Sequence, residues 1–190
     1  MLHKYIILLL IIFLPLNIMA VENPTLIKLM DTKDKKSLEQ YISKFSQDVK
    51  SSEDFLALGI AYHNLALIKE DLETSTKAVE LLKKAGEFYE GQYNKKNPLI
   101  LIYLGSSYTL LGRDSKKIAQ KVSNVNTGLA FIDKAVSLDS NNITLRIIRA
   151  SNSLELPEMF GRDKKIKEDL AYLDPNSNLA LKIKAFLKDK

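Results

Sequence analysis

Few residues in this sequence have side chains that could carry out chemistry, and those few do not form a recognisable group. The 190-residue chain has no cysteine and only two histidines, His3 and His63. A zinc site needs several Cys or His ligands, and a nucleophilic enzyme needs a base next to its nucleophile. The sequence also lacks a glycine-rich phosphate loop, a Gly-x-Ser-x-Gly motif and a His-Glu-x-x-His motif. We therefore predict no catalytic residue, no metal site, no cofactor and no enzymatic activity.

A Gly-Arg-Asp sequence that occurs twice is the strongest remaining candidate for a chemical motif. It stands at residues 112–114 and 161–163, and in both copies two lysines and an isoleucine follow closely. Gly112 is expected to stop a helix in the left-handed conformation, which costs little only for glycine. Asp114 and Asp163 are expected to cap the helices that follow. We interpret the repeated sequence as a turn between helices and not as a catalytic signature.

The first twenty residues have the layout of a secretory signal peptide. Lys4 precedes an apolar stretch from Tyr5 to Leu16, and the segment ends on the small residue Ala20. The apolar stretch is shorter than the roughly 20 residues that a membrane-spanning helix needs. We expect cleavage after Ala20 and export, with no membrane insertion afterwards; an uncleaved membrane anchor is the alternative. Residues 21–190 are expected to form one domain.

Composition limits the classes of partner and the means of stabilisation. The formal net charge is +5, from 28 basic and 23 acidic residues, and the lysines are scattered among the acids. Only four residues are arginines, the better side chain for phosphate recognition, so we predict no nucleic-acid binding. Without cysteine, the exported domain must be stabilised by apolar packing alone. Lysine- and asparagine-rich composition is typical of bacteria with AT-rich genomes, which favours the periplasm as the destination.

Helical periodicity occurs along nearly the whole chain. Glycine and proline are scarce, apolar residues recur at helical spacing, and no alternating strand pattern is present, so the fold class is predicted to be all-α. Asn97 followed by Pro98 is typical of a helix start. The apolar series from Ile118 to Val136 predicts one helix of about seven turns. Helices are expected at approximately 35–49, 52–67, 71–89, 98–112, 114–136, 142–154, 163–172 and 177–188.

Two short words occur twice at a similar spacing. Leu-Gly-x-x-Tyr stands at 58–62 and again at 104–108, and a pattern of small and apolar residues at 78–85 is matched at 128–135. The small glycine allows a partner helix to approach closely, while the flanking Leu and Tyr fill the space beside it. With these words the chain resembles tetratricopeptide repeat (TPR) proteins, which are built from helical hairpins of 34 residues.

The resemblance to TPR proteins implies both a fold and a binding surface. The fold would be a right-handed superhelix of antiparallel helical hairpins, an α-solenoid with about three repeats at 52–94, 97–140 and 142–176 and a C-terminal capping helix. In such proteins the first helix of each hairpin lines a concave face on which ligands bind. The resemblance places ten residues there: Ile60, His63, Asn64, Ile102, Ser106, Thr109, Arg113, Thr144, Ile147 and Ser151.

This mixture of apolar and small polar residues suits a peptide or protein segment better than a highly charged ligand. We therefore predict an exported adaptor or scaffold that binds a protein or peptide partner on its concave face. The alternative is a small-molecule-binding accessory component of an envelope transport system, in which the terminal helices close the groove into a pocket. Neither the identity of the partner nor the oligomeric state follows from the residues.

Overall fold

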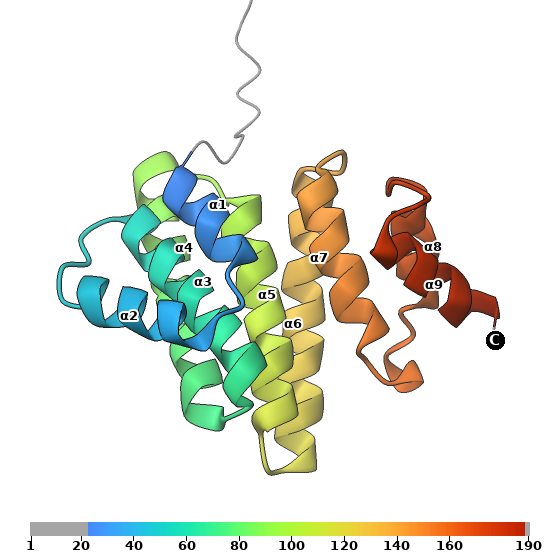
Figure 1. Ribbon diagram of the computed structural model, residues 1–190, viewed down its shortest axis with the longest axis horizontal. Coiled ribbons are helices and arrows are strands. Elements are labelled where there is room, and N and C mark those ends of the chain that lie inside the picture. Colours follow the sequence, from blue (N-terminus) through green and yellow to red (C-terminus); the bar gives the residue numbers. More distant parts are fainter. Residues whose placement is uncertain (1–22, 189–190) are drawn as a thin grey trace, which may run out of the picture.

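The computed structural model describes residues 23–188, so the predicted signal peptide lies outside the described residues. Within this range the chain forms nine α-helices, one short 3-10 helix and no strand, which confirms the all-α prediction (Figure 1). The helices are α1 Pro24–Asp31, α2 Lys35–Phe45, α3 Ser52–Lys69, α4 Leu72–Tyr93, α5 Pro98–Asp114, α6 Ile118–Leu138, α7 Ile143–Leu154, α8 Asp163–Leu170 and α9 Asn178–Lys188, with the 3-10 helix η1 at Glu158–Phe160.

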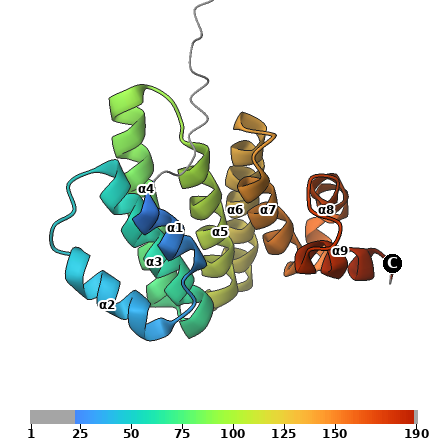
Figure 2. The same ribbon diagram turned by 45° about the horizontal axis from the view of Figure 1, so that its top comes forward.

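The helices are arranged in a regular series of contacts. Helices α3 and α4, α5 and α6, and α7 and α8 pack pairwise, each pair being joined by a connection at one end (Figure 1). The odd-numbered helices α1, α3, α5, α7 and α9 also contact one another in sequence (Figure 2). Most helices therefore pack mainly against their neighbours along the chain, whereas α1 packs against α3.

Local sequence signals account for where most helices begin. The Ser51 hydroxyl accepts a hydrogen bond from the backbone N–H of Asp54, whose carboxylate accepts one from the N–H of Ser51, which completes a capping box. Asp71 caps α4, and Asn97 caps α5 with Pro98 at the first helical position. The predicted starts of these helices are confirmed, and Asn142 caps α7 in the same way.

The pair α5 and α6 has a backbone-to-backbone contact at its centre. A Cβ atom on Gly105 would lie 2.6 Å from the carbonyl oxygen of Gly128, and one on Gly128 would lie 2.5 Å from the carbonyl oxygen of Gly105. Atoms cannot approach so closely, so only glycine at both positions permits this helix spacing. The glycine of the second Leu-Gly-x-x-Tyr word therefore acts through its small size.

The first Gly-Arg-Asp copy is not a turn, and that prediction is wrong. Helix α5 continues through Gly112 to Asp114, and the left-handed backbone expected at Gly112 is absent. A Cβ on Gly112 would lie 2.7 Å from a methyl carbon of Val125, so this glycine admits α6 at close range. Asp114 closes α5 instead of capping α6, whose N-cap position is Lys117.

The second copy is a turn, but its aspartate has a different position from the one predicted. Gly161 adopts the left-handed conformation, with φ of 62°, between η1 and α8. Asp163 is the first residue of α8, and Arg162 occupies the N-cap position without a capping hydrogen bond from its side chain. Ile118, the first residue of the predicted apolar series, is 79% exposed, because the first turn of α6 is exposed and its buried residues begin only at Val125.

Helix α1 was not foreseen, although its start signal is plain. Asn23 accepts hydrogen bonds from the backbone N–H groups of Thr25 and Leu26, and Pro24 follows, as at the start of α5. The Leu26 and Leu29 side chains belong to a large apolar cluster that extends from α1 to α7. A second, smaller cluster is formed by the C-terminal side of α7 with α8 and α9.

Candidate functional site

The ten residues predicted on the concave face do not form one exposed surface. Thr144, Ile147 and Ser151 of α7 are exposed, and Arg113 is half-buried. The other six are buried: Ile60, His63, Asn64, Ile102, Ser106 and Thr109. Helix α1 packs against α3, and α7 packs against α5, so neighbouring helices cover these side chains. The buried six are not part of an open surface in this structure, and a binding role for any of the ten stays a prediction.

His63 is held between α3 and α5 in a dry environment. Its Nδ1 atom lies 3.0 Å from the Ser107 hydroxyl, and its ring meets the edge of Tyr103 at a centroid distance of 5.4 Å. Burial, and to a lesser extent the charge of Arg113, lowers the pKa of His63 to about 4. The Ser107 side chain is fully buried. The pair resembles a base beside a nucleophile, but both side chains are buried, His63 being 5% exposed.

Ser106 and Thr109 connect α5 to α7. The Asn152 side-chain amide donates to the Ser106 hydroxyl at 3.1 Å and to the Thr109 hydroxyl at 2.9 Å. Thr109 in turn donates to the carbonyl oxygen of Ser106 at 2.7 Å. These polar side chains join two helices of the same layer.

Arg113 was expected at the mouth of a groove, but its guanidinium is bound by the protein itself. Its Nε donates to the Asp114 carboxylate at 2.7 Å, and its Nη2 donates to the carbonyl oxygen of Ala66 at 2.8 Å. The Ala66 carbonyl belongs to the last turn of α3, so Arg113 ties the end of α5 to the end of α3. A ligand would have to break these bonds to reach the charge.

The other three arginines form a network with three carboxylates where α6, α7 and α8 meet. Arg149 donates to the fully buried Asp169 through Nε at 2.8 Å and Nη2 at 2.5 Å. Arg146 donates to the same carboxylate at 2.9 Å, and its guanidinium stacks on the Tyr172 ring at 3.5 Å. The hydrogen bond from Arg149 lowers the pKa of Glu168 to about 2. The network is balanced in charge and joins helices.

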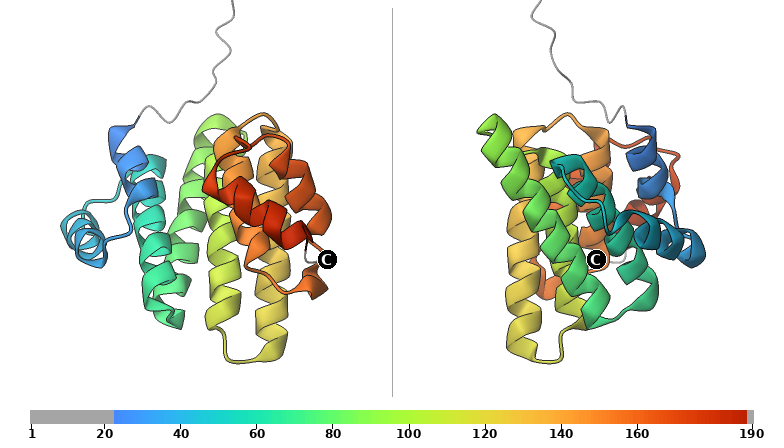
Figure 3. Two further views of the ribbon diagram at one scale, coloured as in Figure 1. Left: turned by 45° about the vertical axis from the view of Figure 1, so that its right-hand side comes forward. Right: turned by 90° about the vertical axis from the view of Figure 1, so that its left-hand side faces the viewer.

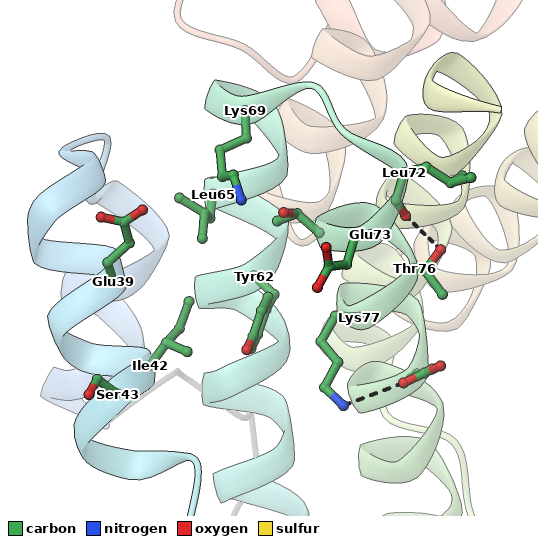
Figure 4. A pocket seen from close by; sticks show the side chains of 12 residues that line it. Glu39, Ile42, Ser43, Tyr62, Leu65, Lys69, Leu72, Glu73, Thr76 and Lys77 are labelled. Atoms are coloured by element: carbon green, nitrogen blue, oxygen red, sulfur yellow. Dashed lines mark hydrogen bonds and ion pairs between the residues drawn. The ribbon is translucent and has the colours of Figure 1, made fainter. Parts of the chain in front are cut away.

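A cleft of about 870 Å³ lies between α2, α3 and α4 (Figure 4). Tyr62 and Leu65 of α3 form its floor and Ile42 of α2 faces it from one side, while Leu72 lies at its edge, at the start of α4, with its side chain directed away from α3. Tyr62 and Ile42 are partly exposed, so the apolar part of the cleft is open to solvent. An open, partly apolar recess between two helical walls is suited to hold part of another molecule.

Charges of both signs line the rim of this cleft. Glu39 stands on the α2 side, Lys69 at the end of α3, and Glu73, Lys77 and Glu80 along α4. The ammonium group of Lys77 lies 3.5 Å from the carboxylate of Glu80, but both side chains are about half exposed, so this pair contributes little stability. Mixed, weakly paired charges let the rim form ion pairs with either sign on a partner.

A smaller recess of about 330 Å³ lies between α4, α5 and α6, near the start of α5. Tyr108, the counterpart of Tyr62 in the Leu-Gly-x-x-Tyr words, does not line it. The Tyr108 ring is instead covered by Phe131, which stacks on it at a centroid distance of 5.8 Å, and by Lys83, which lies over it at 5.4 Å.

Sequence reasoning missed this cleft because it assigned Tyr62 to the core and treated one side of α3 only. A usable signal was present in helix length and composition. Helix α3 has 18 residues and is apolar on almost all sides, which requires cover around its circumference. Helix α2 has only 11 residues, so it is about 10 Å shorter than α3 and leaves part of the outer side open.

Between residues 23 and 188, no three His, Asp or Glu side chains are grouped so as to hold a metal ion. Within the same range, no helix combines the length and hydrophobicity needed to cross a membrane.

Comparisons with known proteins identify no relative. No protein-family model matches the chain, and neither a curated protein nor a solved structure is significantly similar to it.

Proposed function

We propose that this chain is an exported, TPR-like helical repeat protein that binds a segment of a protein partner as an adaptor, with the cleft between α2 and α4 as its contact site. The observation that carries the proposal is the cleft itself, with its apolar floor and charged rim. A helical segment laid between α2 and α4 would place apolar side chains on Tyr62 and Leu65 and charged ones at the rim. This is the helix-in-groove mode of peptide recognition.

Equivalent glycine contacts support the repeat relationship. A Cβ on Gly59 would lie 2.6 Å from the Leu82 side chain, and one on Gly105 would lie 2.7 Å from the Ile132 side chain. Leu82 and Ile132 occupy matching positions in the second pair of repeated words. The two hairpins therefore use the same pair of positions for a close contact, as repeated units of a superhelix would.

Export is proposed from the N-terminal sequence. Residues 1–20 combine a basic start, an apolar stretch and a small residue at the expected cleavage position. The absence of cysteine is compatible with an oxidising compartment, because the fold needs no protected thiol. The periplasm is accordingly the proposed place of action.

A protein segment is preferred over a small molecule because most of the cleft lining is accessible from outside. Small-molecule sites bury most of the ligand surface, and a recess with exposed walls cannot do so. The alternative, a metabolite-binding accessory component of a transport system, would need α2 to close over the floor formed by Tyr62. Stabilisation of the protein by a metabolite, with no protein partner, would favour that alternative.

Site-directed cross-linking can test the proposal. Because the chain has no cysteine, Ser43→Cys introduces a single thiol on the α2 side of the cleft. A photoreactive group is then attached to this thiol. Cross-linked envelope protein would be identified by mass spectrometry, and the linked segment would be synthesised and titrated against the purified chain. Ser123→Cys on the exposed face of α6, away from the cleft lining, is the matched control position.

Two matched leucine variants would then locate the contact. Leu72→Glu places a charge at the edge of the cleft, whereas Leu67→Glu places one at a similarly exposed position on α3 outside the cleft lining. Leu72→Glu should weaken binding at least tenfold, and Leu67→Glu should leave it within about twofold. Equal effects of the two variants, or cross-links that do not depend on the label position, would disprove the cleft as the contact site.

A further inference from the structure

Helix α1 lies on a different side of α3 from the cleft and is held there by a few defined contacts. In the right-hand view of Figure 3, α1 and α4 stand on opposite sides of α3. The Leu26 and Leu29 side chains, three residues apart on one side of α1, are only 6% and 5% exposed. Lys28, between them in sequence, is exposed. Helix α1 therefore binds the body of the protein through a single narrow apolar stripe.

A buried amide on α3 recognises the C-terminal end of α1. Asn64 donates from Nδ2 to the carbonyl oxygen of Leu29 at 2.6 Å and to that of Thr32 at 3.3 Å. These carbonyls lie at the end of the helix, where the Leu29 carbonyl also accepts from the backbone N–H of Thr32 at 3.1 Å. Asn64 is 8% exposed, so its amide would lose its hydrogen-bond partners if α1 left and nothing replaced it.

The seat thus combines an apolar surface with a donor directed at the end of a helix, which are the features that recognise a short helix in any chain.

Two properties of α1 make its seat exchangeable. It has eight residues, fewer than the ~12–15 that an isolated helix needs for stability in water, so its helical form depends on docking. Only three residues, 32–34, connect it to α2, and cleavage after Ala20 would leave it close to a free chain end. Terminal segments with few contacts open at the lowest free-energy cost in a protein.

We infer that the surface of α3 beneath α1, here called the α1 seat, is a second interaction surface. Its partner is a short helix of another protein with two leucine-like side chains three residues apart, whose terminal carbonyls accept from Asn64. Helix α1 occupies the seat within the same chain and competes with that partner. This inference is independent of the proposed function of the cleft.

A mobility measurement on the full chain tests the exchange. Lys28→Cys introduces the only cysteine and carries a nitroxide spin label on the exposed side of α1. The probe is a synthetic peptide of residues 23–33. Excess peptide should displace α1 and add a rapidly tumbling component to the label's spectrum. The same peptide with Leu26→Ser and Leu29→Ser should have no effect. An unchanged spectrum at millimolar peptide, or equal responses to both peptides, would overturn the inference.

Affinity measurements with variants provide a second, independent readout. Leu29→Ser in the full chain weakens the competing α1, so the peptide should bind at least tenfold more tightly than to the wild-type chain. Adding Asn64→Ala should reverse most of this gain. No gain with Leu29→Ser, or a general loss of helicity in that variant, would show that α1 is an integral element and would also overturn the inference.

A cleft variant separates the two proposals. Leu72→Glu should leave the peptide response unchanged, because Leu72 lines the cleft and not the α1 seat. A response abolished by Leu72→Glu would place the peptide in the cleft and refute the seat. Failure to find a cleft partner would leave the displacement result standing.

Discussion

Arg162 and Asp133 form a two-bond ion pair between the turn before α8 and helix α6. The two guanidinium nitrogens donate to the two carboxylate oxygens at 2.8 and 2.7 Å. Arg162 also donates from Nε to the Ser153 hydroxyl at 3.2 Å, so one side chain reaches both α6 and α7. The arginine of the repeated Gly-Arg-Asp sequence therefore positions the last hairpin.

Arg162→Ala should lower the free energy of unfolding by about 2 kcal/mol. The variant removes both hydrogen bonds from the guanidinium of Arg162 to the carboxylate of Asp133, which are largely buried. The value is moderate because the Asp133 side chain keeps a third of its surface in water. Urea unfolding monitored by circular dichroism gives the change. Arg162→Lys, which retains charge but not the two-bond geometry, should lie in between. An unchanged midpoint for both variants would contradict the prediction.

Glu168 should make the protein less stable in acid. Hydrogen bonding from Arg149 holds the pKa of Glu168 at about 2 in the folded state, below the ordinary value of 4.5. The stabilisation is therefore complete above pH ~4.5 and is lost as pH falls toward 2. Glu168→Gln should flatten the dependence of stability on pH in this window, measured from urea midpoints. Parallel pH profiles for the variant and the wild-type chain would refute the assignment.

His63 should produce a separate loss of stability on acidification, in a pH window above that of Glu168. Burial lowers its pKa from 6.5 to about 4, so the unfolded chain takes up a proton that the folded chain refuses. Stability should therefore fall by up to roughly 3 kcal/mol between pH 6.5 and 4. His63→Phe should remove this dependence while leaving the Glu168 window intact. A chemical shift of His63 that titrates near pH 6.5 in the folded protein would disprove this explanation.

Gly105→Ala should destabilise the protein by about 2–4 kcal/mol, because the added methyl group would meet the backbone of α6. Gly91→Ala is the matched control. It lies in α4 with no atom within 4 Å of a Cβ, and it should stabilise the helix by about 0.5–1 kcal/mol. Thermal unfolding of the two variants should shift in opposite directions. Similar shifts would mean that helix propensity, not close packing, explains both glycines.

Signal-peptide cleavage can be checked directly by mass. Expression with an intact N-terminus should yield a soluble envelope protein that begins at Val21. N-terminal sequencing or intact mass spectrometry provides the measurement. Recovery of the full-length chain in the membrane fraction would instead support the anchor alternative.

The all-α class and the first residues of most helices could be predicted, because both depend on residues that are close together in the sequence. Asn97 and Pro98, or Ser51 and Asp54, act within one turn, so the sequence alone indicates them. Gly112 shows the limit of such rules. Glycine can end a helix or permit another helix to approach, and only the position of Val125 in space decides which role it has.

The candidate site was less predictable than the fold because exposure depends on distant segments. The outward side of α3 looked free in sequence, but Asn64 is covered by α1, 35 residues earlier in the chain. Similarly, nothing near Arg149 indicates that Asp169 will meet it. The cleft beside Tyr62 results from the difference in length between two helices, which local periodicity does not report.

The arginine network has a consequence for cooperativity. It lies between the two apolar clusters, and α7 belongs to both, through Leu145 on one side and Ala150 on the other. Apolar packing tolerates small slides of one helix along another, whereas buried charged groups fit only one register. The network therefore allows the C-terminal pair α8 and α9 to pack against α7 in one register only, so we expect this pair to unfold together with the rest of the molecule. Because buried pairs are poorly screened, this joint should persist in concentrated salt.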